Sequence, residues 1–273
     1  MKSVVRDLLS GGSLEDAGLL LAHVLGRDRA WLISHDEHEL TKVQTERFTA
    51  LCERRRLGEP LAYITGSAGF YGRSFSVDAR VLVPRPETEH LIDDALVFLQ
   101  NRSAACVLDV GTGSGAIACT LAAELRTLRA DAVDVSAEAL TVARENARAL
   151  RVSERITFFE GDLVAAVRPR RYDCVVANLP YVPTLDIAHA PDPVSFEPRI
   201  ALDGGPDGLD LYRRLLAGAP HVTLPGGLVL MEAAPPNVHA LAALARYAFA
   251  PAEVTVGKDY GGRDRYVKVR TPG

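Results

Sequence analysis

The sequence has few of the residues typical of disulfide-rich or metal-binding proteins. Its 273 residues include four cysteines, one tryptophan and two methionines, and only 6% are aromatic. Cys52, Cys106, Cys119 and Cys174 form no C-x-x-C pair, and no histidine lies nearby at ligand spacing. We interpret these cysteines as small buried residues in a reducing compartment, and we predict no metal site.

Long apolar runs and a strong net charge are also missing. No apolar stretch reaches the roughly 18 to 20 residues that a membrane-spanning helix needs. The first residues, MKSVVRDLLSGG, lack the apolar centre and cleavage site of a signal peptide. We therefore expect a cytoplasmic protein that binds no membrane. The formal net charge of -4, from 31 basic and 35 acidic residues, argues against a generic nucleic-acid binder.

The composition is that of a globular protein, and the length suffices for one large domain and a small one. Residues 1–65 are predicted to form a helical domain, because capping patterns at Ser13–Asp16 and Thr41–Gln44 precede amphipathic segments. Aromatic and β-branched residues broken by glycines predict a β-hairpin linker at 66–84. Residues 85–273 are expected to form the larger domain.

Strands and helices alternate through this larger domain. We predict seven strands, at residues 106–109, up to 135, 156–159, 172–177, 228–231, 253–256 and 266–269. Helices are predicted from about 115, from 136, near 207 and at 239–247, and a Pro-Gly-Gly turn at 225–227. Such alternation is typical of a mostly parallel sheet with helices on both faces. The predicted fold class is therefore α/β and Rossmann-like.

A glycine-rich loop follows the first of these strands. Gly111, Gly113 and Gly115 lie where that strand turns into a helix. Glycine permits the positive φ angles and the close backbone approach that a ligand at a helix N-terminus requires. The looser dinucleotide pattern G-x-G-x-x-A also fits, so the loop alone does not define the cofactor. Asp134 ends the second strand where an acidic side chain meets ribose hydroxyls, which favours a nucleoside ligand over a plain turn.

Two further loops are expected at the same edge of the sheet. Asp162 follows the third strand, where it either accepts a hydrogen bond from an adenine amino group or forms a turn. Asn178-Leu-Pro-Tyr181 follows the fourth strand. The Asn178 oxygen and the Leu179 carbonyl can accept both N–H groups of an amide or amine, while Tyr181 packs on its plane. Positioning and desolvation would then present the nitrogen to an electrophilic methyl group.

Four segments of the chain together resemble one family: FYGRSFSVDARVLVPRPETE, DVGTGSGAIA, NLPYVP and EPRIALDGGPDGLDLYRRLL. They are similar to the protein-glutamine N5-methyltransferases of the HemK family, over essentially the whole chain. The resemblance implies a class I S-adenosylmethionine-dependent methyltransferase fold in 85–273, with the helical domain helping to recognise the substrate. It also implies that the substrate is the glutamine of the Gly-Gly-Gln loop in peptide-chain release factors.

The resemblance also implies a set of site residues. The cofactor would be bound by Gly111, Thr112, Gly113, Ser114, Gly115, Asp134, Asp162, Leu163 and Asn178. The substrate would be bound by Asn178, Leu179, Pro180, Tyr181, Glu197 and Arg199, of which Asn178, Pro180 and Tyr181 are catalytic. Residues 84–88 would cover the cofactor from the other side. Residues 197–199 would brace the substrate loop, with a Glu–Arg pair as one possible means.

Two departures from the family pattern leave the substrate open. The family usually has Asn-Pro-Pro-Tyr, whereas this chain has Leu179 in second place, as ribosomal-RNA adenine dimethyltransferases do. The backbone carbonyl survives the change, but the loop loses rigidity and gains a bulky side chain. The second departure is Met231–Asn237, where two prolines at 235–236 indicate a rebuilt pocket edge. A paralogous N-methyltransferase acting on another amide or amine is therefore an alternative.

Other functions compete with this interpretation. A nucleic-acid adenine N-methyltransferase would use the same amide grip. It would need a basic surface, and the chain offers only the arginines within 54–56 and 168–171. An N-methyltransferase acting on a small molecule or peptide also fits. A cofactor-binding protein that has lost its catalytic site is disfavoured, because Asn178, Pro180 and Tyr181 are all present. A nicotinamide oxidoreductase would fit the glycine loop but would give the Asn-Leu-Pro-Tyr loop no function.

Overall fold

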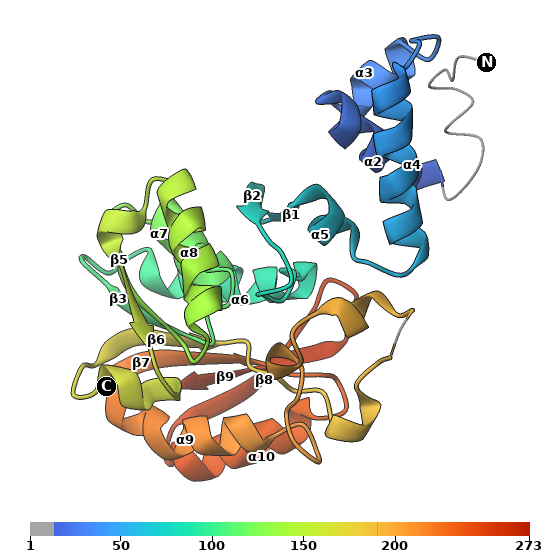
Figure 1. Ribbon diagram of the computed structural model, residues 1–273. Helices are drawn as coiled ribbons and strands as arrows, with labels where there is room; N and C mark the ends of the chain where they lie inside the picture. Colours follow the sequence, from blue (N-terminus) through green and yellow to red (C-terminus); the bar gives the residue numbers. More distant parts are fainter. Residues whose placement is uncertain (1–13, 190) are drawn as a thin grey trace. The chain divides into compact units, whose positions relative to one another are not determined.

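The computed structural model describes residues 14–189 and 191–273 (Figure 1). Ser13, the predicted cap of the first helix, lies outside these residues. The chain divides into two compact units, Met1–Ser67 with Ala188–Phe196, and Ala68–Ile187 with Glu197–Gly273. None of the helices in the described part combines the length and apolar character needed to cross a membrane.

The smaller unit is helical. Its described part contains α2 (Leu14–Leu25), α3 (Arg29–Ser34), α4 (Lys42–Arg56), α5 (Leu61–Thr65) and the 3-10 turn η5 (Pro193–Phe196). Leu20, Leu21 and Phe48 belong to its buried apolar core. The predicted capping box opens α4, since Thr41 and Gln44 accept hydrogen bonds from each other's backbone N–H groups, at 2.9 and 3.2 Å.

The arginine run at the end of α4 is paired within the same unit. Arg54 forms an ion pair with Glu59, Arg55 with Asp16 and Arg56 with Glu53. All three guanidinium groups therefore have an acidic neighbour. These ion pairs offset the positive charge of the run within its own unit.

A two-stranded hairpin, β1 (Ser67–Phe70) and β2 (Arg73–Ser76), precedes the main sheet. Phe70 and Phe75 are buried on one side and meet edge to face, with ring centroids 6.0 Å apart. Asn146 of α8 (Ala137–Ala149) holds the hairpin in place, because its side chain accepts from the Ser76 N–H at 2.7 Å and donates to the Ser76 carbonyl at 3.0 Å. The hairpin is thereby fixed to the larger unit.

A seven-stranded sheet in the order β5-β4-β3-β6-β7-β9-β8 forms the centre of the larger unit (Figure 1). Its strands are β3 (Cys106–Val110), β4 (Arg129–Asp134), β5 (Ile156–Glu160), β6 (Tyr172–Ala177), β7 (Thr223–Glu232), β8 (Glu253–Lys258) and β9 (Asp264–Arg270). The pairs β5·β4, β4·β3, β3·β6 and β6·β7 are parallel, and β9 is antiparallel to β7 and β8. The predicted fold class is confirmed.

Helices cover both faces of this sheet. They are α6 (Glu89–Leu99), α7 (Ala116–Glu124), α8 (Ala137–Ala149), α9 (Asp210–Val222) and α10 (Val238–Ala248). One apolar core lies beneath α6, α7 and α8, and a second lies beneath α9 and α10 on the other face. Short 3-10 turns complete the unit: η1 (Pro86–Thr88), η2 (Ser153–Arg155), η3 (Leu163–Val167), η4 (Thr184–Asp186) and η6 (Arg199–Ala201).

The Pro-Gly-Gly segment at 225–227 differs from its prediction as a turn before a strand. It lies inside β7, where the register against β6 shifts between Tyr172 and Cys174. Gly226 accounts for the irregularity, since it adopts φ 65° and its carbonyl accepts from Arg102 at 2.9 Å. Bonds to the terminal segment, such as Thr271 N to the Gly227 carbonyl at 3.0 Å, keep the segment within the sheet.

Candidate active site

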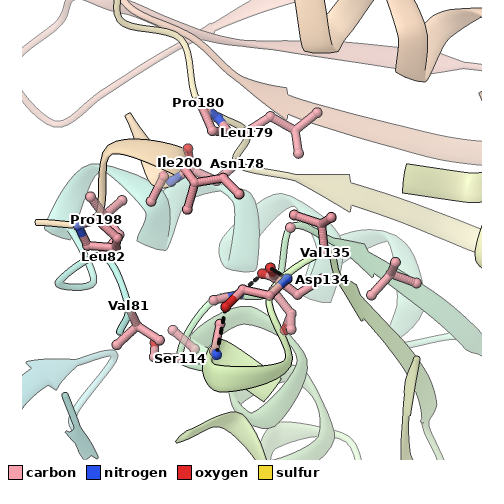
Figure 2. Close-up of a pocket in the computed structure, with 18 of the residues that line it drawn as sticks. Val81, Leu82, Ser114, Asp134, Val135, Asn178, Leu179, Pro180, Pro198 and Ile200 are labelled. Atoms are coloured by element: carbon pink, nitrogen blue, oxygen red, sulfur yellow. Dashed lines mark hydrogen bonds between the residues drawn. The ribbon is translucent and has the colours of Figure 1, made fainter. Parts of the chain in front are cut away.

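A cavity of about 500 Å³ opens at the carboxyl edge of the parallel strands (Figure 2). Ligand sites in open α/β sheets lie at this edge, and small-molecule pockets measure roughly 300–1,000 Å³. The last residues of β3, β4 and β6 are close in register, which brings Gly111, Asp134 and Asn178 together in the cavity lining. Strand pairing therefore assembles three predicted site residues that are far apart in the sequence.

The glycine loop has the backbone conformation that its sequence predicts. Gly111, Gly113 and Gly115 adopt φ angles of 74°, 54° and 80°, in the left-handed region that favours glycine. A Cβ at Gly111 would lie 2.8 Å from the Leu179 side chain, whereas one at Gly113 would meet no protein atom within 4 Å. The space above Gly113 is thus open to a ligand. Gly111 and Gly113 line the cavity, and Gly115 is not among its lining residues.

Buried polar groups hold the loop in this shape. The Asp109 carboxylate accepts from the Thr112 hydroxyl at 2.6 Å and from the Ala118 N–H at 3.1 Å. Complete burial raises the pKa of Asp109 to about 6. Asn146 donates to the Ser114 carbonyl at 2.9 Å, so one carboxamide links the glycine loop to the β1–β2 hairpin. The predicted residues Thr112 and Ser114 both line the cavity.

Asp134 bridges two loops at the cavity wall. Its carboxylate accepts from the Gly113 N–H and from the Ser136 N–H, each at 2.9 Å. Burial raises the pKa of this carboxyl above its usual value. A carboxylate offers about four acceptor positions, so two backbone bonds leave capacity for the hydroxyl groups of a ribose.

Asp162 is engaged by a partner that the sequence did not predict. Its carboxylate forms an ion pair with Arg214 of α9, and both side chains are half exposed. Both residues line the cavity, together with Leu163. Leu163 adopts φ 49°, which is uncommon for a residue other than glycine. The pair gives this end of the cavity a polar rim.

The Asn178 carboxamide is oriented by two residues from other elements. Its Nδ2 donates to the Thr88 hydroxyl at 2.9 Å, and Thr88 in turn donates to the Glu232 carboxylate at 2.7 Å. Thr88 ends η1, and Glu232 ends β7. Burial raises the pKa of Glu232 to about 7. The role of Glu232 was missed in the sequence, where its only signal is an acidic residue after the apolar stretch 228–231.

Leu179 packs into the protein and also lines the cavity. Its side chain is 3% exposed and belongs to the apolar core beneath α9 and α10. Its N–H donates to the hydroxyl of buried Tyr212 at 3.1 Å, and that hydroxyl donates to the Glu232 carbonyl. A proline at position 179 would lack this N–H, so the bond to Tyr212 provides a restraint in place of the proline ring.

The remaining predicted substrate residues are divided between the cavity and its surroundings. Pro180 lines the cavity, whereas Tyr181 is not among the lining residues, and its hydroxyl donates to Glu232 at 3.3 Å. Glu197 is buried and forms an ion pair with Arg85 at 2.6 Å. Arg199 is exposed and pairs with Asp203 at 3.2 Å. Glu197 thus pairs with an arginine outside the 197–199 segment considered from the sequence, and this pair joins it to the 84–88 segment, which contributes Pro84, Arg85 and Thr88 to the cavity wall.

A seven-stranded sheet with an antiparallel β9, a glycine-rich turn after β3 and an acidic residue at the end of β4 define the fold of a class I methyltransferase. Comparisons with known proteins agree. The Methyltransferase small domain model matches residues 92–190, and the PrmC N-terminal domain model matches residues 8–66. A T. thermophilus 16S rRNA N2 G1207 methyltransferase, solved with AdoMet and guanosine, has a TM-score of 0.53 and 17% identity, covering 75% of this chain and 49% of that one. It shows the fold.

The chain belongs to the release factor glutamine methyltransferase family. It is 42% identical to the Moorella thermoacetica member over 264 residues, which cover 96% of this chain and 93% of that protein. The Bordetella pertussis member is 40% identical over 266 residues, covering 96% and 97%. The resemblance noted in the sequence is confirmed. The protein is an S-adenosylmethionine-dependent protein glutamine methyltransferase.

Proposed function

We propose that this enzyme methylates the side-chain nitrogen of the Gly-Gly-Gln glutamine in a peptide-chain release factor. Relatives at about 40% identity over nearly the whole chain carry the name release factor glutamine methyltransferase. The structural observation that carries the proposal is the Asn178 carboxamide at the cavity wall. Its Nδ2 is committed to Thr88, so its oxygen is available to accept from a primary amide.

We propose that the cavity binds S-adenosylmethionine, which supplies a methyl group bonded to a positively charged sulfur. Residues 111–115 would hold its methionine part, Asp134 its ribose, and Asp162 with Leu163 its adenine. The open space above Gly113 and the spare acceptor capacity of Asp134 fit such a ligand. Because Asp162 already forms an ion pair with Arg214, its carboxylate would accept hydrogen bonds from both the Arg214 guanidinium and the adenine amino group.

The substrate amide would be held by neutral acceptors. The Asn178 oxygen and the Leu179 carbonyl would each accept one N–H of the glutamine amide, and Pro180 would stiffen the backbone between them and Tyr181. With both N–H groups held, the face of the nitrogen turns towards the methyl donor. Catalysis then rests on positioning in a desolvated site, and the methylated nitrogen releases one proton to water.

The buried Leu179 side chain supports the family's substrate over that of a divergent paralogue. The Leu179 side chain, which differs from the usual Asn-Pro-Pro-Tyr, packs in the apolar core and against Gly111, and Leu179 is also part of the cavity lining. Pro235 and Pro236, the second departure, are not among the cavity-lining residues. Both departures thus leave the polar atoms of the amide grip in place.

We further propose that residues 1–65 help to recognise the release factor and that residues 85–273 carry out catalysis. The match of 8–66 to the PrmC N-terminal domain supports this division. A truncated chain starting in the hairpin would then retain S-adenosylmethionine binding and lose affinity for the release factor. Equal KM values for the release factor with and without the helical unit would refute the division.

The substrate is tested by incubating the enzyme with methyl-labelled S-adenosylmethionine and purified release factor. The control acceptor is the same release factor with the Gly-Gly-Gln glutamine replaced by alanine. We expect label on the wild-type factor alone. Equal labelling of both acceptors, or none while calorimetry shows cofactor binding, would contradict the proposal.

A further inference from the structure

We propose that Thr88 and Glu232 are positioning residues that fix which end of the Asn178 carboxamide faces the substrate. The inference rests on the proposed role of Asn178 as acceptor of the substrate amide. A carboxamide has two ends of similar shape but opposite hydrogen-bonding character, so an amide-binding asparagine needs a neighbour that selects one of them.

The selection comes from the order of donors and acceptors. The carboxyl oxygen Oε2 of Glu232 accepts the single hydroxyl proton of Thr88 across 2.7 Å. The Thr88 oxygen is then left as an acceptor towards Asn178, at 2.9 Å. The NH2 end of the carboxamide therefore faces Thr88, and the oxygen faces the opposite way.

The fold makes this arrangement rigid. Ala177 and Met231 are paired neighbours at the ends of β6 and β7, which places the next residues, Asn178 and Glu232, side by side. Thr88 is 4% exposed and Glu232 is 1% exposed, so water does not compete for their hydrogen bonds. The Tyr181 hydroxyl donates to the other oxygen of Glu232 at 3.3 Å, which restrains the carboxylate further.

The arrangement has a consequence for catalysis. If the carboxamide turned over, its NH2 group would face the N–H groups of the substrate amide, and two donors would meet. The glutamine would then lose one of its two acceptors and the alignment of its nitrogen. Misplacement of about 1 Å costs on the order of 100-fold in rate, so the loss should appear in kcat.

The test compares Thr88→Val, which keeps the shape and removes the hydroxyl, with Thr88→Ser, which keeps the hydroxyl. With release factor as acceptor, we expect Thr88→Val to lower kcat by about 10- to 100-fold and to leave the Kd for S-adenosylmethionine within about 3-fold. Thr88→Ser should retain kcat within about 3-fold. Equal kcat values for Thr88→Val and wild type, or equal losses in both variants, would overturn the proposal.

A double-mutant cycle tests whether Glu232 acts through Thr88. Glu232→Gln should lower kcat in the wild-type background and add little to Thr88→Val, because one hydrogen-bonded chain is already broken. Fully additive losses of Thr88→Val and Glu232→Gln would contradict the coupling.

A readout without turnover separates this inference from the proposed function. In 15N-labelled enzyme, the Asn178 side-chain NH2 signals are assigned by their loss in Asn178→Ala. We expect them to shift and exchange faster with solvent in Thr88→Val but not in Thr88→Ser. Unchanged NH2 signals in both variants would refute the positioning role. If wild-type enzyme transferred no methyl label to the release factor, only the proposed substrate would be refuted.

Discussion

The side-chain nitrogen of Asn178 lies 2.9 Å from the hydroxyl oxygen of Thr88, so the end of β6 is tied to the segment that precedes α6. Both residues line the cavity at the carboxyl edge of the sheet. The contact leaves the Asn178 oxygen as the polar atom of this side chain available to a substrate amide.

Replacing Asn178 by alanine should abolish turnover and weaken cofactor binding only modestly. The carboxamide oxygen serves mainly the substrate, so kcat should fall by more than about 100-fold. Calorimetry should show the Kd for S-adenosylmethionine within about 5-fold of wild type, less than 1 kcal/mol. Turnover at the wild-type rate would refute the amide grip.

Asp134→Ala should act on the cofactor. It removes the acceptor proposed for the ribose and the two 2.9 Å bonds that hold the Gly113 and Ser136 N–H groups. Hydrogen bonds to charged groups contribute about 1.5–3 kcal/mol, so the Kd for S-adenosylmethionine should rise about 10- to 100-fold. Calorimetry checks this, with a melting curve to confirm folding. An unchanged Kd would exclude the ribose role.

Stability should depend on pH through Glu232. The pKa of its carboxyl is raised from 4.5 to about 7, chiefly because the group is buried. Hydrogen bonds from Thr88 and Tyr181 and the charge of Arg265 lower the pKa, and the charge of Glu87 raises it, but burial outweighs them. A raised carboxyl pKa means that the folded state binds the proton more tightly, so the free energy of unfolding falls as pH rises from about 4.5 to about 7.

Glu232→Gln isolates this contribution. Relative to this variant, wild type should lose on the order of 3 kcal/mol between pH 4.5 and pH 8, by urea unfolding monitored at each pH. Parallel curves for wild type and Glu232→Gln would show that Glu232 is not the titrating group.

Leu179→Pro tests the departure from the family pattern. The substitution removes the 3.1 Å bond from the Leu179 N–H to Tyr212 and takes a branched side chain out of the core. We expect a loss of about 2–3 kcal/mol in the free energy of unfolding, with the release factor still methylated. Leu179→Ala is the matched control, because it removes the side chain and keeps the N–H. If methylation were lost in Leu179→Pro but retained in Leu179→Ala, the hydrogen bond from the Leu179 N–H to Tyr212 would be essential for activity, contrary to this expectation.

The parts of the site that lie on local sequence patterns were predictable. The alternation of strands and helices defined the sheet, and the spacing of Gly111, Gly113 and Gly115 defined a loop in which these three glycines have positive φ angles. Strand ends in a parallel sheet meet at one edge, so the residues that follow them could be placed there from the sequence. Asp134 and Asn178 lie at that edge for this reason.

Pairings between distant segments were not predictable in the same way. Glu232 lies 144 residues from Thr88, and Arg85 lies 112 residues from Glu197. A single sequence contains no periodicity that relates such positions, and their contacts arise only when β6 and β7 pair and the 84–88 segment folds over the sheet edge. The ion pair of Asp162 with Arg214 was missed for the same reason.

Tandem mass spectrometry of the release factor, after incubation with enzyme and S-adenosylmethionine, shows directly which residue is methylated. We expect the mass increase of one methyl group on the peptide that contains Gly-Gly-Gln, with fragment ions assigning it to the glutamine. The increase should be absent when the enzyme is Asn178→Ala. A methyl group on another residue of the factor, or an unmodified factor in the presence of enzyme that binds S-adenosylmethionine, would contradict this expectation.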